Sequence, residues 1–460
     1  MTRIEGNESE APEVPAWDRR LDRRAALVLL LLVLGVYLFT GQTTVSQNND
    51  SRAAALAAWS LGTHGTVALP DGWDPESVSW HAEGADGRLY VNRFPGVILW
   101  GAPFYAVSGL ITGDRGTPVH PHLIDYRPAA VAAATATALG VLVSFWLFRR
   151  LTDRRTAVAA ALVLAFATSV WSISGTALWT HGVTHLMLAL GMVGVARERQ
   201  AGAGLAYAFA VFTRPQTAIV PAVVGVWEGA HRRRLRPVVV LGVTSVLGLI
   251  GMVAYSRTIF GTWMPISGYG SYGVTNIVET GPFEQGRRLV LAFVDPRRGL
   301  LLYAPFLLLL VPGLRAAWRS APPWVRSSAV AGVAYFLVQL RVNDFDGGTY
   351  FIAYRLPIEM LVLTAPLLVL SYDRFVRRNM ARITGFVVLV AVAAFWQVVG
   401  VVHYSSEDIL WEFYVEEVHD VCADPEIDCD PAEIMRPSRG RHPTDVKATA
   451  DAPAARDATL

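Results

Sequence analysis

Long apolar blocks separated by short polar segments run along most of the sequence. Segments of this kind are typical of helices that cross a bilayer, which takes roughly 20 residues. Residues 201–213 and 217–229 are shorter, so we expect them to be tilted or broken at Arg214-Pro215. The pattern predicts an all-α fold, a polytopic transmembrane helical protein with about eleven spans. The blocks fall near residues 25–41, 128–148, 156–172, 183–196, 201–213, 217–229, 237–256, 300–314, 327–340, 356–371 and 383–402.

One further apolar block, residues 94–112, is interrupted by proline and glycine. Whether it crosses the membrane decides the side of every later loop. If it does not cross, seventeen arginines fall in loops on the same side as the arginine-rich segment before the first span. Basic loops stay in the cytoplasm, so we predict a juxtamembrane or re-entrant segment at 94–112. The arginine-bearing loops are 149–155, 197–199, 232–236, 315–326 and 374–382.

This topology predicts three parts of the chain. Residues 1–24 form a cytoplasmic N-terminal tail, since no cleavage site for a signal peptide follows the first span. Residues 25–403 form the transmembrane domain, with a first outer loop at 42–127 and a second large outer loop at 257–299. Residues 404–460 form an extracytoplasmic tail, disordered after about residue 436 because of its Pro, Ala, Asp and Arg content.

Composition supports a membrane protein and narrows its source. Hydrophobic residues make up 53% of the chain and charged residues 17%. Lys447 is the single lysine, which with the abundant alanine suggests a GC-rich prokaryotic genome and hence a prokaryotic plasma membrane. Cys422 and Cys429 are the two cysteines. Both fall in the tail predicted to be outside, where we expect a disulfide between them; two free thiols are the alternative.

Asp50 opens a short helix-like run just after the first span. A run over residues 53–61 carries an apolar stripe, and Gly62 is a plausible C-terminal stop. Two interpretations of Asp50 follow from these residues. It caps the N-terminus of the helix, or it holds a carboxylate at the membrane surface for chemistry.

Arginines are unexpectedly frequent in the segments predicted to be outside. Their planar forks of donors suit phosphate, so a cluster at the membrane face would hold the phosphate of a lipid carrier. Headgroup contacts and salt bridges within loops are the alternative. These arginines are Arg52, Arg88, Arg93, Arg214, Arg257, Arg287, Arg288, Arg297, Arg298, Arg341 and Arg355.

Metal chemistry has little support in the sequence. His181 and His185 are four residues apart on a predicted helix, but no H-E-x-x-H pattern accompanies them. Asp344 and Asp346 form a D-x-D that suits a divalent ion or pairs with neighbouring arginines. No cofactor is indicated with certainty, and neither a phosphate-binding loop nor a nucleophile elbow is present in the sequence.

Several short motifs, taken in order, resemble the GT-C superfamily of integral membrane glycosyltransferases. The branch that they resemble includes protein O-mannosyltransferases and the lipid A aminoarabinose transferase. The match begins with an acid after the first span and the D-G-R-x-Y…P-G stretch at 86–96, and it extends from about residue 25 to 372. Its other motifs are 147–151, 213–215, 259–269, 298–306 and 347–356. The second outer loop departs from the family, because Thr180-His181-Gly182 stands where many relatives carry an acid.

The resemblance implies that a sugar moves from a polyprenyl-phosphate donor to an acceptor hydroxyl at the outer face. Asp50 takes the place of the family's general base, and Arg355 that of an arginine opening a late span. We expect Arg355 and one or both of Arg88 and Arg93 to hold phosphate, with Arg52 and Arg214 also in the binding site. Tyr90 and His181 are expected to line the sugar pocket. Glycan, lipid or protein acceptors all fit. A transporter of a lipid-linked glycan and a non-catalytic assembly factor for envelope glycans stay open as alternatives.

Overall fold

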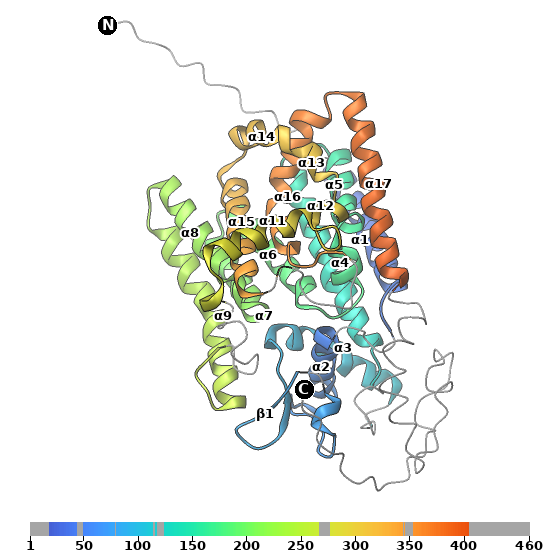
Figure 1. Ribbon diagram of the computed structural model, residues 1–460, viewed down its shortest axis with the longest axis vertical. Coiled ribbons are helices and arrows are strands. Elements are labelled where there is room, and N and C mark those ends of the chain that lie inside the picture. Colours follow the sequence, from blue (N-terminus) through green and yellow to red (C-terminus); the bar gives the residue numbers. More distant parts are fainter. Residues whose placement is uncertain are drawn as a thin grey trace, which may run out of the picture.

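The computed structural model describes residues 18–43, 49–78, 80–113, 116, 124–265, 277–343, 345 and 353–403. This part of the chain is a bundle of helices with one two-stranded antiparallel hairpin (Figure 1). Asp344, Asp346, Cys422, Cys429 and the predicted tail at 404–460 lie outside the described residues, as does most of the N-terminal tail. The predicted division into a tail, a membrane domain and a second tail therefore stays a prediction.

The N-terminal half contains α1 (Arg19–Phe39), α2 (Asn49–His64), η1 (Pro75–Ser77), β1 (His81–Glu83), β2 (Leu89–Val91), α3 (Pro95–Thr112), α4 (Arg127–Arg149), α5 (Arg154–Phe166), the π-helical turn η3 (Val170–Gly175), α6 (Thr180–Ala196) and α7 (Gln200–Thr213). The C-terminal half contains η4 (Pro215–Ala218), α8 (Ile219–Arg232), α9 (Arg236–Phe260), α11 (Pro282–Val294), α12 (Leu300–Tyr303), α13 (Leu307–Leu310), η5 (Val311–Gly313), α14 (Leu314–Ser320), α15 (Pro323–Val342), α16 (Ile358–Ser371), η6 (Tyr372–Val376) and α17 (Met380–His403).

The loops predicted to be inside meet at one end of the bundle. Arg149 Nε lies 3.0 Å from Asp22 Oδ1, so the loop after α4 joins the start of α1. Arg377 Nη1 lies 2.5 Å from Asp153 Oδ2, which brings the segment after α16 to the same loop. Arg150 donates to the carbonyl of Ala196 at the end of α6. The arginine-rich loops, which the sequence predicts on one side of the membrane, therefore lie together at one end of the bundle.

The opposite end carries α2, the hairpin and α3 (Figure 1). The backbone N–H of Gln42, after α1, donates to Thr176 O at this end, and α4 begins here at Arg127. Trp100 in the first half of α3 donates to Ala132 O, in the second turn of α4. α3 thus packs against the segments at this end, although its length and apolar composition alone would allow it to span a membrane. The juxtamembrane or re-entrant assignment of residues 94–112 stays a prediction.

Close packing against α3 explains a glycine that the sequence pattern misassigned. We expected Gly62 to end the helix that follows Asp50, but α2 continues to His64 and Gly65 follows it with a φ of 71°. A Cβ on Gly62 would lie 2.3 Å from Ala102 O of α3. Gly62 therefore lets two helices approach closely, and Gly65 supplies the left-handed stop.

Proline interrupts the predicted helices at two places. The segment 300–314 forms α12, α13 and η5 instead of one helix, because Pro305 lacks an N–H and Ala304 before it leaves the helical conformation with a φ of −139°. The spans 201–213 and 217–229 are separated at Arg214, whose backbone is extended before Pro215. The expected break at Arg214-Pro215 is confirmed.

Apolar side chains also cover much of the outside of the bundle. Exposed leucine, valine and isoleucine side chains lie along α1 and α9, and valine and phenylalanine side chains along α17. Surfaces of this size and apolarity are stable against lipid and not against water. Four described helices are long and apolar enough to span a membrane: α3, α4, α9 and α17. The chain is a multi-pass membrane protein, and the count of about eleven spans stays a prediction.

Reporter fusions after residues 152, 234 and 377 test the orientation of the bundle. All three positions lie at the arginine-rich end, so each fusion should report the cytoplasm. Alkaline phosphatase activity together with green fluorescence at each junction measures this. An outside signal at any one position contradicts the topology, and a fusion after His64 in the outer loop is the control that should report the opposite side.

Candidate active site at the outer ends of the helices

The carboxylate of Asp50 lies between two arginines from distant parts of the chain. Asp50 sits in the first turn of α2 and not at its N-cap. Its Oδ1 accepts a hydrogen bond from Arg93, which joins β2 to α3, and its Oδ2 accepts one from Arg355 at 2.9 Å. The Asp50 side chain keeps 25% of its surface exposed, whereas that of Arg93 keeps 3%. The carboxylate of Asp50 is thus more exposed than either of the two arginines that it contacts.

Each of the two arginines also lies over a tryptophan ring. The guanidinium carbon of Arg93 is 4.7 Å from the ring centroid of Trp80, and that of Arg355 is 4.6 Å from the ring of Trp179. Contacts of this kind fix the plane of the fork and add about 0.5–2 kcal/mol each. The two guanidiniums therefore keep their orientation independently of Asp50.

Charge controls the ionisation of Asp50. Burial raises the pKa of this carboxyl, but the positive charges of Arg93 and Arg355 and the hydrogen bonds that they donate outweigh burial and lower the pKa to about 2. Asp50 is therefore a carboxylate at neutral pH. In this state it is a weak proton acceptor, because a base works best when its pKa lies near the working pH.

Backbone contacts hold both arginine-bearing segments. The N–H of Asn92 donates to Trp80 O at 2.7 Å, which places Trp80 beside the residue that precedes Arg93. The hydroxyl of Ser169 donates to Tyr354 O at 2.9 Å, next to Arg355. The geometry of the arginine pair is thus set by main-chain contacts on both sides.

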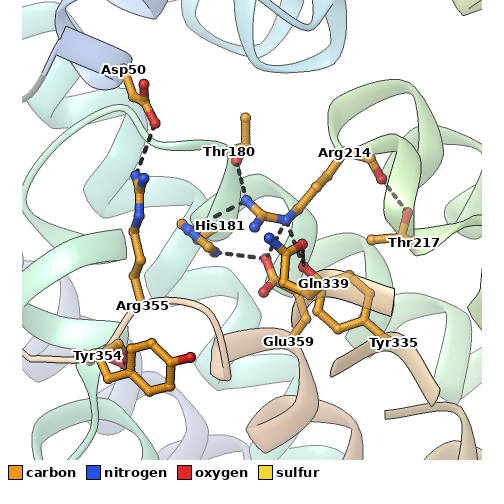
Figure 2. A network of polar contacts seen from close by, with 11 residues as sticks. Asp50, Thr180, His181, Arg214, Thr217, Tyr335, Gln339, Tyr354, Arg355 and Glu359 are labelled. Atoms are coloured by element: carbon orange, nitrogen blue, oxygen red, sulfur yellow. Dashed lines mark hydrogen bonds and ion pairs between the residues drawn. The ribbon is translucent and has the colours of Figure 1, made fainter. Parts of the chain in front are cut away.

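A second, deeper network adjoins the first (Figure 2). His181 Nδ1 lies 2.8 Å from Glu359 Oε1, and Arg214 Nε lies 3.6 Å from the same oxygen. Arg214 also donates to the hydroxyl of Tyr335 at 2.6 Å and to that of Thr180 at 3.0 Å. Figure 2 shows Arg355 reaching to Asp50 beside this group, and the ring of Trp179 lies 6.2 Å from that of His181.

The residues of the deeper network lie at the beginnings of helices or between them. His181 and Glu359 occupy the first turns of α6 and α16, where the helix dipole favours a negative charge. Arg214 is the extended residue between α7 and η4. Glu359 is fully buried, and its Oε2 has no hydrogen-bond partner among the described residues. A buried carboxylate with spare acceptor capacity is costly, which marks this as a functional group more than a structural one.

The structure brings together five of the residues singled out from the sequence: Asp50, Arg93, His181, Arg214 and Arg355. Four others have different surroundings. Arg52 donates to Asn49 Oδ1 within α2, and Arg88 lies in the turn of the hairpin. The hydroxyl of Tyr90 donates to Asp86 and its ring packs on Phe260, so it faces the hairpin turn and α9. His185 lies deeper in α6, 3.2 Å from the hydroxyl of Ser144.

Sequence reasoning missed several residues of the networks: Trp80, Trp179, Tyr335, Gln339 and Glu359. Glu359 had a usable signal, since an acid inside an apolar block is rare and is a functional candidate by default. It also supplies, from α16, a carboxylate beside Thr180-His181-Gly182, where the sequence has none. Within the described ranges no three His, Cys, Asp or Glu residues group as metal ligands do.

Removing the positive partner of Glu359 should destabilise the fold. Arg214→Gln leaves a buried carboxylate without its arginine, a change that typically costs on the order of 3–5 kcal/mol. The thermal unfolding midpoint in detergent should fall by several degrees. Arg287→Gln removes an exposed partner of Glu284 and serves as the control with an unchanged midpoint. Equal midpoints for wild type and Arg214→Gln would contradict a buried ion pair here.

Comparison with known proteins gives similarity at the level of solved structures. No protein-family model and no curated protein matches the sequence. ArnT from Cupriavidus metallidurans matches in the apo state and bound to undecaprenyl phosphate, both at 16% identity, with TM-scores of 0.45 and 0.46 over 80% and 81% of this chain. The Archaeoglobus fulgidus oligosaccharyltransferase tethered to an acceptor peptide matches at 12% identity, with a TM-score of 0.48 over 85% of the chain.

The chain spans 61% and 63% of the two ArnT chains and 55% of the oligosaccharyltransferase chain. With identities of 12–16% and TM-scores below 0.5, these similarities do not indicate an activity. The function has to be inferred from the residues of this chain.

Proposed function

We propose that this protein is a membrane glycosyltransferase that moves a sugar from a polyprenyl-phosphate donor to an acceptor hydroxyl at the outer face of a prokaryotic plasma membrane. Asp50 is the general base. Arg93 and Arg355 hold the donor phosphate, and His181 belongs to the sugar site. The contact of one carboxylate with two oriented guanidiniums, at the end of the bundle opposite to the arginine-rich loops, carries this proposal.

The chemistry of that contact supports a phosphate ligand. Two planar forks aimed at one anion match the oxygens of a phosphate as well as those of a carboxylate. The surrounding helices present apolar surface to lipid, so a phosphate on a polyprenyl chain reaches the site from the bilayer. The order of the sequence motifs, similar to that of glycosyltransferases, supports a sugar as the transferred group.

The ion pairs of Asp50 also suggest how the base becomes active. Without a ligand, Asp50 pairs with both arginines, which leaves one positive charge over, and the pKa of Asp50 is about 2. A donor phosphate competes for the same forks and draws them away from the carboxylate. The pKa of Asp50 then rises toward its ordinary value of about 3.9 or above. The base therefore gains proton affinity only once the donor is bound.

The transfer step is balanced within this arrangement. The acceptor oxygen attacks the anomeric carbon, and the bond between that carbon and the phosphate oxygen breaks. The hydroxyl proton goes to Asp50, and the bonding electrons leave with the polyprenyl phosphate, whose added charge Arg93 and Arg355 stabilise. General-base help is typically worth about 10²–10⁴ in rate, and fixed positive donors contribute a comparable factor.

Asp50→Asn tests the role of the base. Transfer should fall by about 10²–10⁴, while donor binding stays intact or tightens because the competing carboxylate is gone. Radiolabelled transfer and donor-lipid binding to the purified protein measure the two effects. Asp125→Asn, which removes an outer-loop carboxylate paired with Arg127, is the control that keeps transfer. Unchanged transfer in Asp50→Asn would remove Asp50 from the mechanism. A transporter or an assembly factor needs no base, and either alternative would be favoured if the wild-type protein binds the donor lipid but transfers no sugar.

Two substitutions of Arg355 separate charge from geometry. Arg355→Lys keeps the charge that holds the pKa of Asp50 low but loses the fork, so transfer should fall about tenfold or more. Arg355→Gln loses both, so the pKa of Asp50 should rise and the acid limb of kcat/KM should move to higher pH than in the wild type, with Arg93 still opposing part of the shift.

The pH profile of kcat tests whether the donor phosphate displaces Asp50 from the two arginines. In the donor complex the arginines are shared with phosphate, so the acid limb of kcat should lie above that of kcat/KM in the wild-type protein. Coincident limbs would mean that the phosphate does not displace Asp50. Wild-type kinetics in Arg355→Lys would remove Arg355 from the phosphate site.

A further inference from the structure

A groove of about 390 Å3 opens at the arginine-rich end of the bundle, far from Asp50. It lies where α1, α4 and α6 meet. Three of its lining residues are arginines and four are apolar, and no residue of the candidate active site takes part. The lining residues are Arg19, Arg23, Val143, Trp146, Leu190, Val193 and Arg197.

The rim of the groove is a set of positive charges. Arg19 and Arg23 are four residues apart on α1 and therefore lie on one face of that helix. Arg197 follows the last residue of α6. All three are exposed, and none forms an ion pair with a carboxylate among the described residues.

Three acids lie next to these arginines in the chain, and each has other partners. Asp18, beside Arg19, caps α1 by accepting hydrogen bonds from the N–H groups of Arg20 and Leu21. Asp22, beside Arg23, is fully buried against Arg149, and Glu198, next to Arg197, lies 3.1 Å from Arg232. The positive charge of the rim is thus not neutralised from within the described part of the chain. An anion from outside complements it.

The floor of the groove is apolar and faces the bilayer. Val143 and Trp146 are three residues apart on α4, and Leu190 and Val193 are three apart on α6, so each pair lies on one helix face. Leu190 keeps 39% of its surface exposed. The exposed part of this floor is where an acyl chain would lie, next to the arginine rim.

We propose that this groove binds an anionic phospholipid, with the phosphate on Arg19, Arg23 and Arg197 and an acyl chain along the floor. Basic pockets between helices at the membrane surface bind anionic headgroups, and each arginine near the surface typically strengthens binding by about fivefold. The site lies at the opposite end of the bundle from Asp50 and does not depend on the proposed transferase activity. Phosphatidylglycerol is the probe that carries this chemistry.

Native mass spectrometry of the full chain in a neutral detergent tests the site. Wild-type protein should retain phosphatidylglycerol in preference to phosphatidylcholine. The variant Arg19→Gln, Arg23→Gln, Arg197→Gln should bind one phosphatidylglycerol fewer, with affinity at that site reduced at least about tenfold. A matched control, Arg234→Gln, Arg315→Gln, Arg319→Gln, removes three exposed arginines at the same end outside the groove, and it should bind as the wild type does.

A second variant keeps the charges and fills the groove. Leu190→Trp adds bulk to the floor, and it should lose the same lipid even if the triple variant folds poorly. Glycerol 1-phosphate distinguishes a lipid site from a small-anion site. Displacement of the bound lipid by millimolar glycerol 1-phosphate, equal retention of phosphatidylcholine, or full binding in both groove variants would each overturn the proposal.

Discussion

The pairing of Asp50 with Arg93 and Arg355 joins three parts of the chain that are far apart in sequence. Arg93 is 43 residues and Arg355 is 305 residues from Asp50. The carboxylate offsets the desolvation of both guanidiniums, each of which also lies over a tryptophan ring. These ion pairs connect the outer loop, the hairpin and the start of α16, and they adjoin the apolar contacts that pack α2 against α3.

Helix ends supply the polar groups of both networks. Asp50, His181 and Glu359 lie in first turns. Arg214 lies just outside a helix with an extended backbone, and Arg355 lies in the turn that precedes α16. Inside a bilayer the backbone has to be helical so that its hydrogen bonds are satisfied. Irregular backbone is tolerated only at the ends of the helices or where protein surrounds it. Side chains that converge from several segments are therefore found at the same places. The position of the site follows from this constraint.

The two ends of the bundle differ in how their arginines are used. At the outer end, Arg93 and Arg355 are stacked on tryptophans and aimed at one carboxylate. At the other end, Arg149, Arg154 and Arg377 pair with acids that connect loops. Arg19, Arg23 and Arg197 instead line a groove with an apolar floor. The same residue type thus pairs with one carboxylate over tryptophan rings, connects loops and lines a groove, according to what lies next to it.

The sequence by itself determined the helical membrane fold and the grouping of the arginine-rich loops, and it singled out Asp50 and Arg355, which the structure places in contact. Apolar periodicity and charge are local properties, so they can be read without coordinates. Only the tertiary structure decided that Arg93 and not Arg88 reaches Asp50, that Tyr90 faces the hairpin turn, and that Glu359 meets His181 and Arg214. Gly62 shows the same limit, since it is a stop by local pattern and a contact point in the bundle. These outcomes depend on which helices pack together across hundreds of residues, and no local pattern encodes that.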